Sequence, residues 1–204
     1  MTTPLTKCCA ALLLSFNLAC VLAYAEVSPS DYFKITREPA LANALAILTQ
    51  IEGETTMQSL QAHQAHIIFQ DLKGFGPKYA GDDALTLVND KTHQQVIYMS
   101  NRHEHAPYQA LAALIHHESM HSDNTNSIQE ELCAWTAEAQ TWEAMQTTFP
   151  ELKNIPTKDS PLIDRLNAIV ILLNTNKLAA HIKQNPGYQG LPKVSPGFES
   201  CVLN

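Results

Sequence analysis

The sequence has no strongly basic stripe, no internal repeat and no low-complexity segment. Its 13 lysines and arginines are outnumbered by 20 aspartates and glutamates, which gives a formal net charge of −7. Domains that bind nucleic acid carry a concentrated positive surface, so this balance argues against a nucleic-acid partner. After residue 25 no apolar stretch approaches the roughly 20 residues that a membrane helix needs, and we therefore expect no later membrane span.

Cysteine is scarce beyond the N-terminus. Three of the five cysteines lie in residues 1–25, and only Cys133 and Cys201 follow them. An exported chain with two cysteines can pair them, and a Cys133–Cys201 bond would hold the C-terminal tail to the helix that contains Cys133. The alternative is two free thiols, with Cys133 buried and Cys201 in a loose tail.

Residues 1–25 are expected to be a secretory signal peptide, not part of the fold. Lys7 precedes an apolar run that ends in the small-x-small pattern AYA at Ala25. The run is short and contains Asn17, which disfavours an uncleaved membrane anchor. Lipid attachment at Cys20 is disfavoured too, because Asn17 stands where an aliphatic residue is wanted. We predict an exported protein, periplasmic or secreted, with a single domain over residues 26–204.

Chemical information concentrates in the segment LIHHESMHSDNTNSIQEELCAW, which contains one HExxH match formed by His117, Glu118 and His121. Two histidines one helical turn apart can hold a zinc ion, and the glutamate beside the first can act on a water molecule at that ion. Residues 107–122 are rich in helix formers, and the three motif residues fall within the inward stripe of that predicted helix. Buried polar groups need partners, and a metal would supply one; His116 falls outside the stripe and is interpreted as a surface histidine.

A third ligand is expected, because catalytic zinc usually takes three protein ligands and keeps one position open. The polar residues after His121 exclude the HExxHxxGxxH pattern. The next helix begins with a capping box, Ser127-Ile128-Gln129-Glu130, which would fold Glu130 back onto the helix start and leave Glu131 free. The short connection makes a helical hairpin, so we predict Glu131 as the third ligand, with Glu130 and then Asp123 as the alternatives.

HHESMH followed by E-x-x-A-aromatic resembles the gluzincins, which are zinc peptidases with a glutamate ligand. More narrowly, the chain is similar to small exported bacterial proteins that carry HExxH and then an E-x-x-A-aromatic helix with a later tryptophan. The matching positions here are Glu131, Ala134, Trp135 and Trp142. The resemblance covers residues 95 to about 145, although the segment from His121 to Glu131 is shorter than in the large gluzincins. It implies one zinc ion held by two histidines and a glutamate.

The rest of the chain predicts an α+β fold. Apolar periodicity predicts helices at Pro39–Ile51, Thr55–His63, Pro161–Asn174 and Lys177–Lys183. Alternating apolar residues and turn signals predict strands at His66–Phe69, Leu85–Val88 and Val96–Met99. We expect a small antiparallel sheet of about three strands, followed by a helical part that carries the HExxH helix and the second ligand helix.

The strand Val96–Met99 comes just before the HExxH helix. By resemblance to zinc peptidases, a strand in this place lines the cleft, and its free edge can pair with an extended peptide; the alternative is a plain core strand. His103, His105 and Tyr188 are candidates to bind substrate or stabilise an oxyanion. Histidines in loops are more often simply solvated.

These patterns predict an exported zinc-dependent metallohydrolase, most simply a peptidase, with one zinc ion per chain and a peptide or protein substrate. Glu118 would be the general base. The alternative is a non-catalytic zinc-containing binding protein of the cell envelope on the same scaffold, although the presence of Glu118 favours the enzyme. A di-iron carboxylate bundle would need a second E-x-x-H motif, which the chain lacks; a metal-free domain with a chance HExxH is the remaining alternative.

Overall fold

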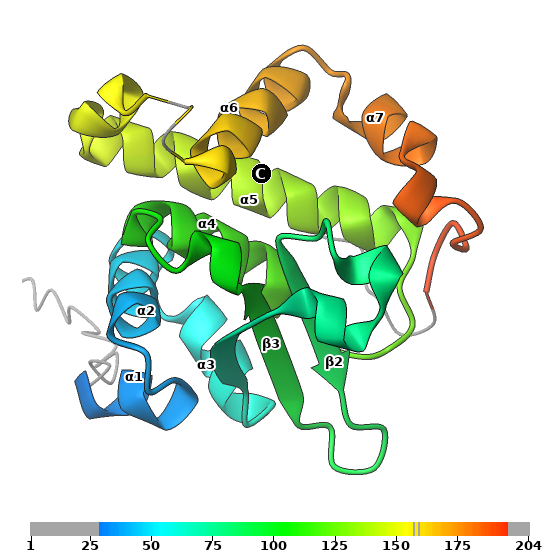
Figure 1. The fold of residues 1–204 in the computed structure, drawn as a ribbon, viewed down its shortest axis with the longest axis horizontal. Coiled ribbons are helices and arrows are strands. Elements are labelled where there is room, and N and C mark those ends of the chain that lie inside the picture. Colours follow the sequence, from blue (N-terminus) through cyan, green and yellow to red (C-terminus); the bar gives the residue numbers. More distant parts are fainter. Residues whose placement is uncertain (1–28, 157, 159, 196–204) are drawn as a thin grey trace, which may run out of the picture.

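The computed structural model describes residues 29–156, 158 and 160–195. They form an α+β fold in which a three-stranded sheet is followed by a helical part (Figure 1). The α-helices are α1 (Pro29–Ile35), α2 (Pro39–Glu52), α3 (Thr55–Ala62), α4 (Tyr108–Ser119), α5 (Ile128–Thr148), α6 (Pro161–Asn174) and α7 (Leu178–Gln184). The strands are β1 (His66–Gln70), β2 (Ala84–Val88) and β3 (Gln95–Ser100). The predicted signal peptide and Cys201 lie outside the described residues.

The sheet is mixed, with the strand order β1-β3-β2. Strands β2 and β3 form the expected antiparallel pair, with Ala84 opposite Met99, but β1 runs parallel to β3, with His66 opposite Val96. The prediction of a wholly antiparallel sheet is therefore wrong in this one pairing. The segment between β1 and β2 crosses the end of the sheet, and β3 then returns between the two earlier strands, which fixes it parallel to β1.

The central place of β3 also corrects the prediction of a free edge at Val96–Met99. Strand β3 is paired on both sides, and its alternate residues Ile97 and Met99 are fully buried. Alternate side chains of a strand point to opposite faces, so these two residues anchor the sheet on the helices. The open edge beside the helical part belongs to β2.

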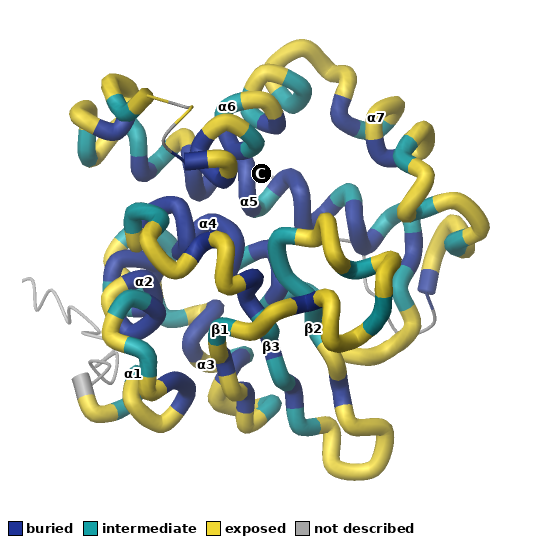
Figure 2. The backbone as a smooth tube through the Cα atoms, viewed as in Figure 1, coloured by how far each residue is buried: buried dark blue, intermediate teal, exposed yellow. Residues whose placement is uncertain are grey.

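Helix α4 is the centre of the fold and packs against both α2 and α5. Nine of its twelve residues are buried, including a run from Ala110 to Ile115. Figure 2 shows buried backbone concentrated along α4 and α5, whereas the outer turns of α6 and α7 are exposed. A helix buried on nearly all sides holds its end in a fixed place, and that end carries the HExxH motif.

The helix predictions for α2, α3, α6 and α7 agree with the structure to within one residue at each end. The HExxH helix is shorter than predicted, because α4 ends at Ser119 and Met120 is its C-cap residue. Helix α1 was not predicted, since its seven residues are too few to show a period. Among the described residues, no helix is both long and apolar enough to cross a membrane.

Candidate metal centre

The last turn of α4 tightens where the motif ends. The amide of Met120 donates to the carbonyl of His117, and that of His121 donates to the carbonyl of Glu118 over 3.3 Å. From β3 the buried amide Nε2 of Gln95 donates to the carbonyl of His121 at 2.8 Å and lies 3.3 Å from that of Glu118. His121 thus lies just past the regular helix but still faces His117, and the two ring centroids are 5.3 Å apart.

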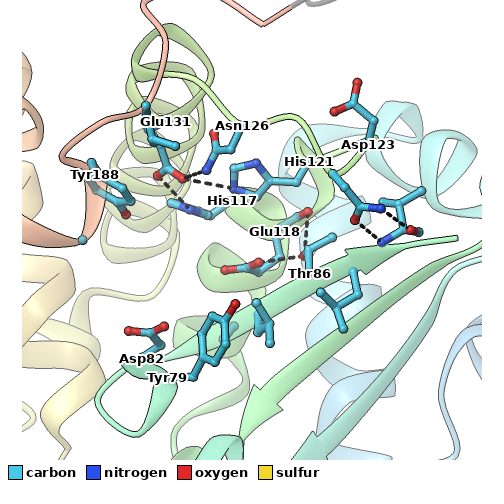
Figure 3. Close-up of a pocket in the computed structure, with 17 residues that line it drawn as sticks. Tyr79, Asp82, Thr86, His117, Glu118, His121, Asp123, Asn126, Glu131 and Tyr188 are labelled. Atoms are coloured by element: carbon cyan, nitrogen blue, oxygen red, sulfur yellow. Dashed lines mark hydrogen bonds and ion pairs between the residues drawn. The ribbon is translucent and has the colours of Figure 1, made fainter. Parts of the chain in front are cut away.

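Helix α5 supplies the third member of the group from its first turn. His117, His121 and Glu131 each offer one ligand atom, and these atoms all lie within 4.8 Å of one another. The Nε2 atoms of the two histidines are each 3.9 Å from an oxygen of Glu131 (Figure 3). The hairpin therefore brings together the three residues that the sequence predicted as ligands, in a group that could hold a metal ion.

Each histidine of the group is oriented by a further carboxylate. Nδ1 of His117 lies 3.0 Å from Glu138, and Nδ1 of His121 lies 2.9 Å from Glu130. A carboxylate accepts a hydrogen bond, so both Nδ1 atoms carry a proton, and in the neutral form of each ring Nε2 presents a lone pair to the centre. Histidine metal ligands commonly have such a carboxylate partner, which fixes the tautomer and the ring orientation.

Glu130 therefore does not take the role that the capping box predicts. The Ser127 hydroxyl does accept the amide of Glu130, as a cap requires, but the Ser127 amide donates to Asn126 rather than to Glu130. The Glu130 carboxylate, released from the helix start, turns to His121. Asn126 accepts the Ser127 amide in place of Glu130. Because Asn126 lies before the four-residue capping-box pattern, that pattern could not predict this contact.

The Glu131 carboxylate has the properties expected of a metal ligand. The residue is 3% exposed, Asn126 donates to its Oε1, and its Oε2 is a buried atom without a hydrogen-bond partner. A buried charged oxygen left without a partner is costly, and an ion between the three side chains would satisfy it. Two imidazole nitrogens and one carboxylate oxygen are a donor set that suits zinc, so the residues present fit this metal.

The same carboxylates act on the protonation of His121. Burial lowers its pKa, but the hydrogen bond to Glu130 and the charges of Glu118 and Glu131 outweigh this effect and raise the pKa of His121 to about 9. Without an ion the site therefore favours a positive charge at this ring. Since a ligand histidine must be neutral, metal binding would displace that proton.

Behind His117 an ion network reaches across the molecule. Arg165 of α6 makes two bonds to the fully buried Glu138 and a third to Asp83, which precedes β2. Although burial raises the pKa of Glu138, the charges of Arg165 and His117 hold it below its usual value. The guanidinium also lies 5.1 Å from the ring of Trp135. Arg165, which holds Glu138 behind His117, is thus itself fixed by α5 and by the residue that precedes β2.

The group opens into a cleft of about 690 Å³. Glu118 lines this cleft without belonging to the metal-binding group, and its Oε2 accepts a hydrogen bond of 2.7 Å from the Thr86 hydroxyl on β2. Tyr188 lies beside Glu131, on the side of the group away from Asp123 (Figure 3). Burial and the nearby Glu131 charge raise the pKa of Tyr188, so its hydroxyl stays protonated.

The open edge of β2 forms one wall of the cleft. The amide and carbonyl of Val88 point away from β3, because both bond to the side chain of Asn124. Backbone groups alternate in direction along an antiparallel strand, so those of Thr86 and Ala84 face outward as well. No described residue bonds to these outward groups of Ala84 and Thr86, and they remain available to an extended chain.

Several other candidate residues lie away from this centre. His103 is buried with its Nε2 2.6 Å from Asp83, and neither His103 nor the exposed His105 lines the cleft. His116 is not a surface histidine: its Nδ1 lies 2.7 Å from the Thr141 hydroxyl, because α5 covers that side of α4. Asp123 lines the cleft but is outside the metal-binding group.

Cys133 is buried and disulfide-bonded. Its predicted partner Cys201 is outside the described residues, so the Cys133–Cys201 pairing stays a prediction. Cys133 lies on α5, two residues after Glu131. It does not belong to the group of possible metal ligands in the described part of the chain.

Sequence reasoning missed Glu138, Arg165 and Thr86. A weak signal for Glu138 was its position seven residues, or two helical turns, after Glu131, which places both on one face of α5. No protein-family model matches the chain, and neither the curated proteins nor the solved structures include a significant match to it. The case for a metal centre therefore rests on the geometry of the described residues.

Proposed function

We propose that the protein is an exported zinc-dependent hydrolase that cleaves peptide bonds. One observation carries the proposal. The Nε2 atoms of two histidines face the two oxygens of the buried Glu131 carboxylate, one of which has no hydrogen-bond partner. Each histidine is held by its own further carboxylate, and Glu118 lies beside this group in an open cleft. A buried charged oxygen without a hydrogen-bond partner is rare in native structures and calls for an explanation, which an ion held by the three side chains would supply.

His117, His121 and Glu131 would hold the ion. Bound zinc supplies a Lewis acid that polarises a carbonyl oxygen and lowers the pKa of water. The Glu118 carboxylate takes the proton of the attacking water and delivers it to the leaving amine. The hydrogen bond from Thr86 holds that carboxylate in the cleft, which is the positioning that a general base needs.

The walls of the cleft support an extended peptide as the substrate. The outward amide and carbonyl groups of Ala84 and Thr86 can add the substrate chain to the sheet as a further strand. On the opposite side, the protonated hydroxyl of Tyr188 can donate to the oxygen that becomes negative during attack. Of the three donor candidates from the sequence, Tyr188 is the one that lines the cleft.

Metal content gives the first test. The purified protein is expected to contain about one zinc ion per chain, which a chelator removes most readily at low pH because protons compete for the histidines. Replacement of both His117 and His121 by alanine should abolish binding, measured by elemental analysis. Full zinc occupancy in that double variant would refute the proposed site.

Catalysis is tested with Glu118→Gln, which keeps size and shape but cannot accept a proton. This variant should bind zinc like the wild type and lose hydrolysis of a broad peptide pool by about a hundredfold or more, the usual effect of losing a general base. Glu104→Gln is the control, because Glu104 is exposed and outside the cleft. If both the wild type and Glu118→Gln bind a peptide partner and neither cleaves it, the protein is a binding module.

A further inference from the structure

The C-terminal strap, residues 191–195, completes the start of helix α5. The carbonyl of Pro192 accepts the amide of Ile128 at 2.9 Å, and the carbonyl of Lys193 accepts that of Gln129 at 3.1 Å. The first amides of a helix have no partner within the helix. A segment more than sixty residues later in the sequence thus satisfies two of them in the turn that presents Glu131.

Ser195 is the last residue of the strap and is 3% exposed. Its Oγ lies 2.8 Å from Oε2 of Glu130 and 3.2 Å from the Ser127 hydroxyl. Since a carboxylate can only accept, the Ser195 hydroxyl donates to Glu130. The other oxygen of Glu130 accepts Nδ1 of His121, so the Glu130 carboxylate is held between the strap and the histidine.

We infer that Ser195 is a positioning residue of the metal centre. It fixes the Glu130 carboxylate, which fixes the ring of His121, and the strap thereby sets the affinity of the site without touching the ion. Loss of the carboxylate partner of a ligand histidine commonly weakens metal affinity by about ten- to hundredfold, and loss of Ser195, which holds that carboxylate, is expected at the lower end of this range. The inference rests on the proposed function only in requiring that His117, His121 and Glu131 hold the metal.

The coupling must act in both directions. If the strap strengthens metal binding, metal binding stabilises the docked strap by the same factor. The metal should therefore protect the amides of Ile128 and Gln129 from hydrogen exchange, because these amides donate to the strap carbonyls. Metal loss would loosen the strap, and with it a wall of the cleft, since Leu191 of the strap lines that wall.

The test compares three variants of the full protein by competition for Zn²⁺ with a chromophoric chelator. Ser195→Ala should bind Zn²⁺ about tenfold more weakly, and Ser195→Thr, which keeps the hydroxyl, should recover most of the loss. Val194→Ala is the matched control on the same strap, because Val194 is 54% exposed. The visible spectrum of bound Co²⁺ should change in Ser195→Ala and return in Ser195→Thr, which a merely structural role would not produce.

If the wild type binds Zn²⁺ through its histidines and Ser195→Ala binds Zn²⁺ equally tightly, this inference is overturned and the proposed function stays intact. A wild type that does not bind Zn²⁺ overturns the proposed function. If Ser195→Ala does not fold, hydrogen exchange on the wild type decides the question. Unchanged exchange at Ile128 and Gln129 on adding Zn²⁺ would refute the coupling, and slower exchange there supports it.

Discussion

At the scale of single residues, two adjacent glutamates take different parts in the candidate site. Neighbouring residues of a helix point about 100° apart, so Glu130 and Glu131 cannot face the same atom. Glu131 turns its unpartnered Oε2 toward Nε2 of His117 and its Oε1 toward Nε2 of His121. Glu130 reaches around to Nδ1 of His121. One side chain can thus bind an ion while its neighbour orients a ligand.

This division predicts unequal losses of zinc affinity. Glu130→Ala should weaken binding by about ten- to hundredfold, as removal of a ligand's carboxylate partner usually does. Glu131→Ala should weaken it further, because the ion loses a ligand itself. Chelator competition measures both, with the exposed Glu143→Ala on the same helix as the control. A larger loss in Glu130→Ala would mean that the two roles are reversed.

At the scale of elements, the site is a junction between the sheet and two helices. Strand β2 holds Glu118 through Thr86, and β3 holds the end of α4 through Gln95. The same stretch of β2 turns backbone groups toward the cleft. A substrate that pairs with this edge would therefore lie beside the residue that positions the base.

Proline substitution tests the edge. Ala84→Pro removes one outward amide and leaves the bonds between β2 and β3 in place, since proline is tolerated at the first residue of an edge strand. The KM for a peptide substrate should rise about three- to tenfold, the effect of one net hydrogen bond, with zinc content unchanged. Ala84→Gly keeps the amide and should retain the wild-type KM. Equal KM values in all three proteins would exclude pairing at this position.

At the scale of the whole molecule, an ion network ties the sheet to the helical part. Asp83, next to β2, binds Arg102, His103 and Arg165, and Arg165 continues to Glu138 behind His117. Burial raises the pKa of Asp83, but the hydrogen bond from His103 and the two arginine charges hold it well below its usual value of 3.8. The ionic contacts of Asp83 thus contribute their stability only while its carboxyl group is ionised.

The pKa of Asp83 is lower in the folded protein than in the unfolded chain. Its contacts therefore stabilise the fold fully above about pH 4, and this stabilisation is lost as the pH falls toward the folded-state pKa. The metal-free wild type should lose about 2–3 kcal/mol more than Asp83→Asn over this range, the usual scale for a salt-bridged aspartate. Urea unfolding at several pH values measures it, with the exposed Asp164→Asn as the control. Parallel pH curves for wild type and Asp83→Asn would contradict the role of the network.

Local sequence patterns were enough to predict the fold class, most element boundaries and the three residues of the metal-binding group. Helical period and strand alternation act over a few residues, and His117, His121 and Glu131 belong to two helices joined by a short connection, so short-range rules could bring them together. Tertiary structure alone decided the parallel pairing of β1, the partners of the histidines and the contact of Ser195 with Glu130. These contacts join residues far apart in sequence, and local preference carries no information about which distant chain will fill a given place.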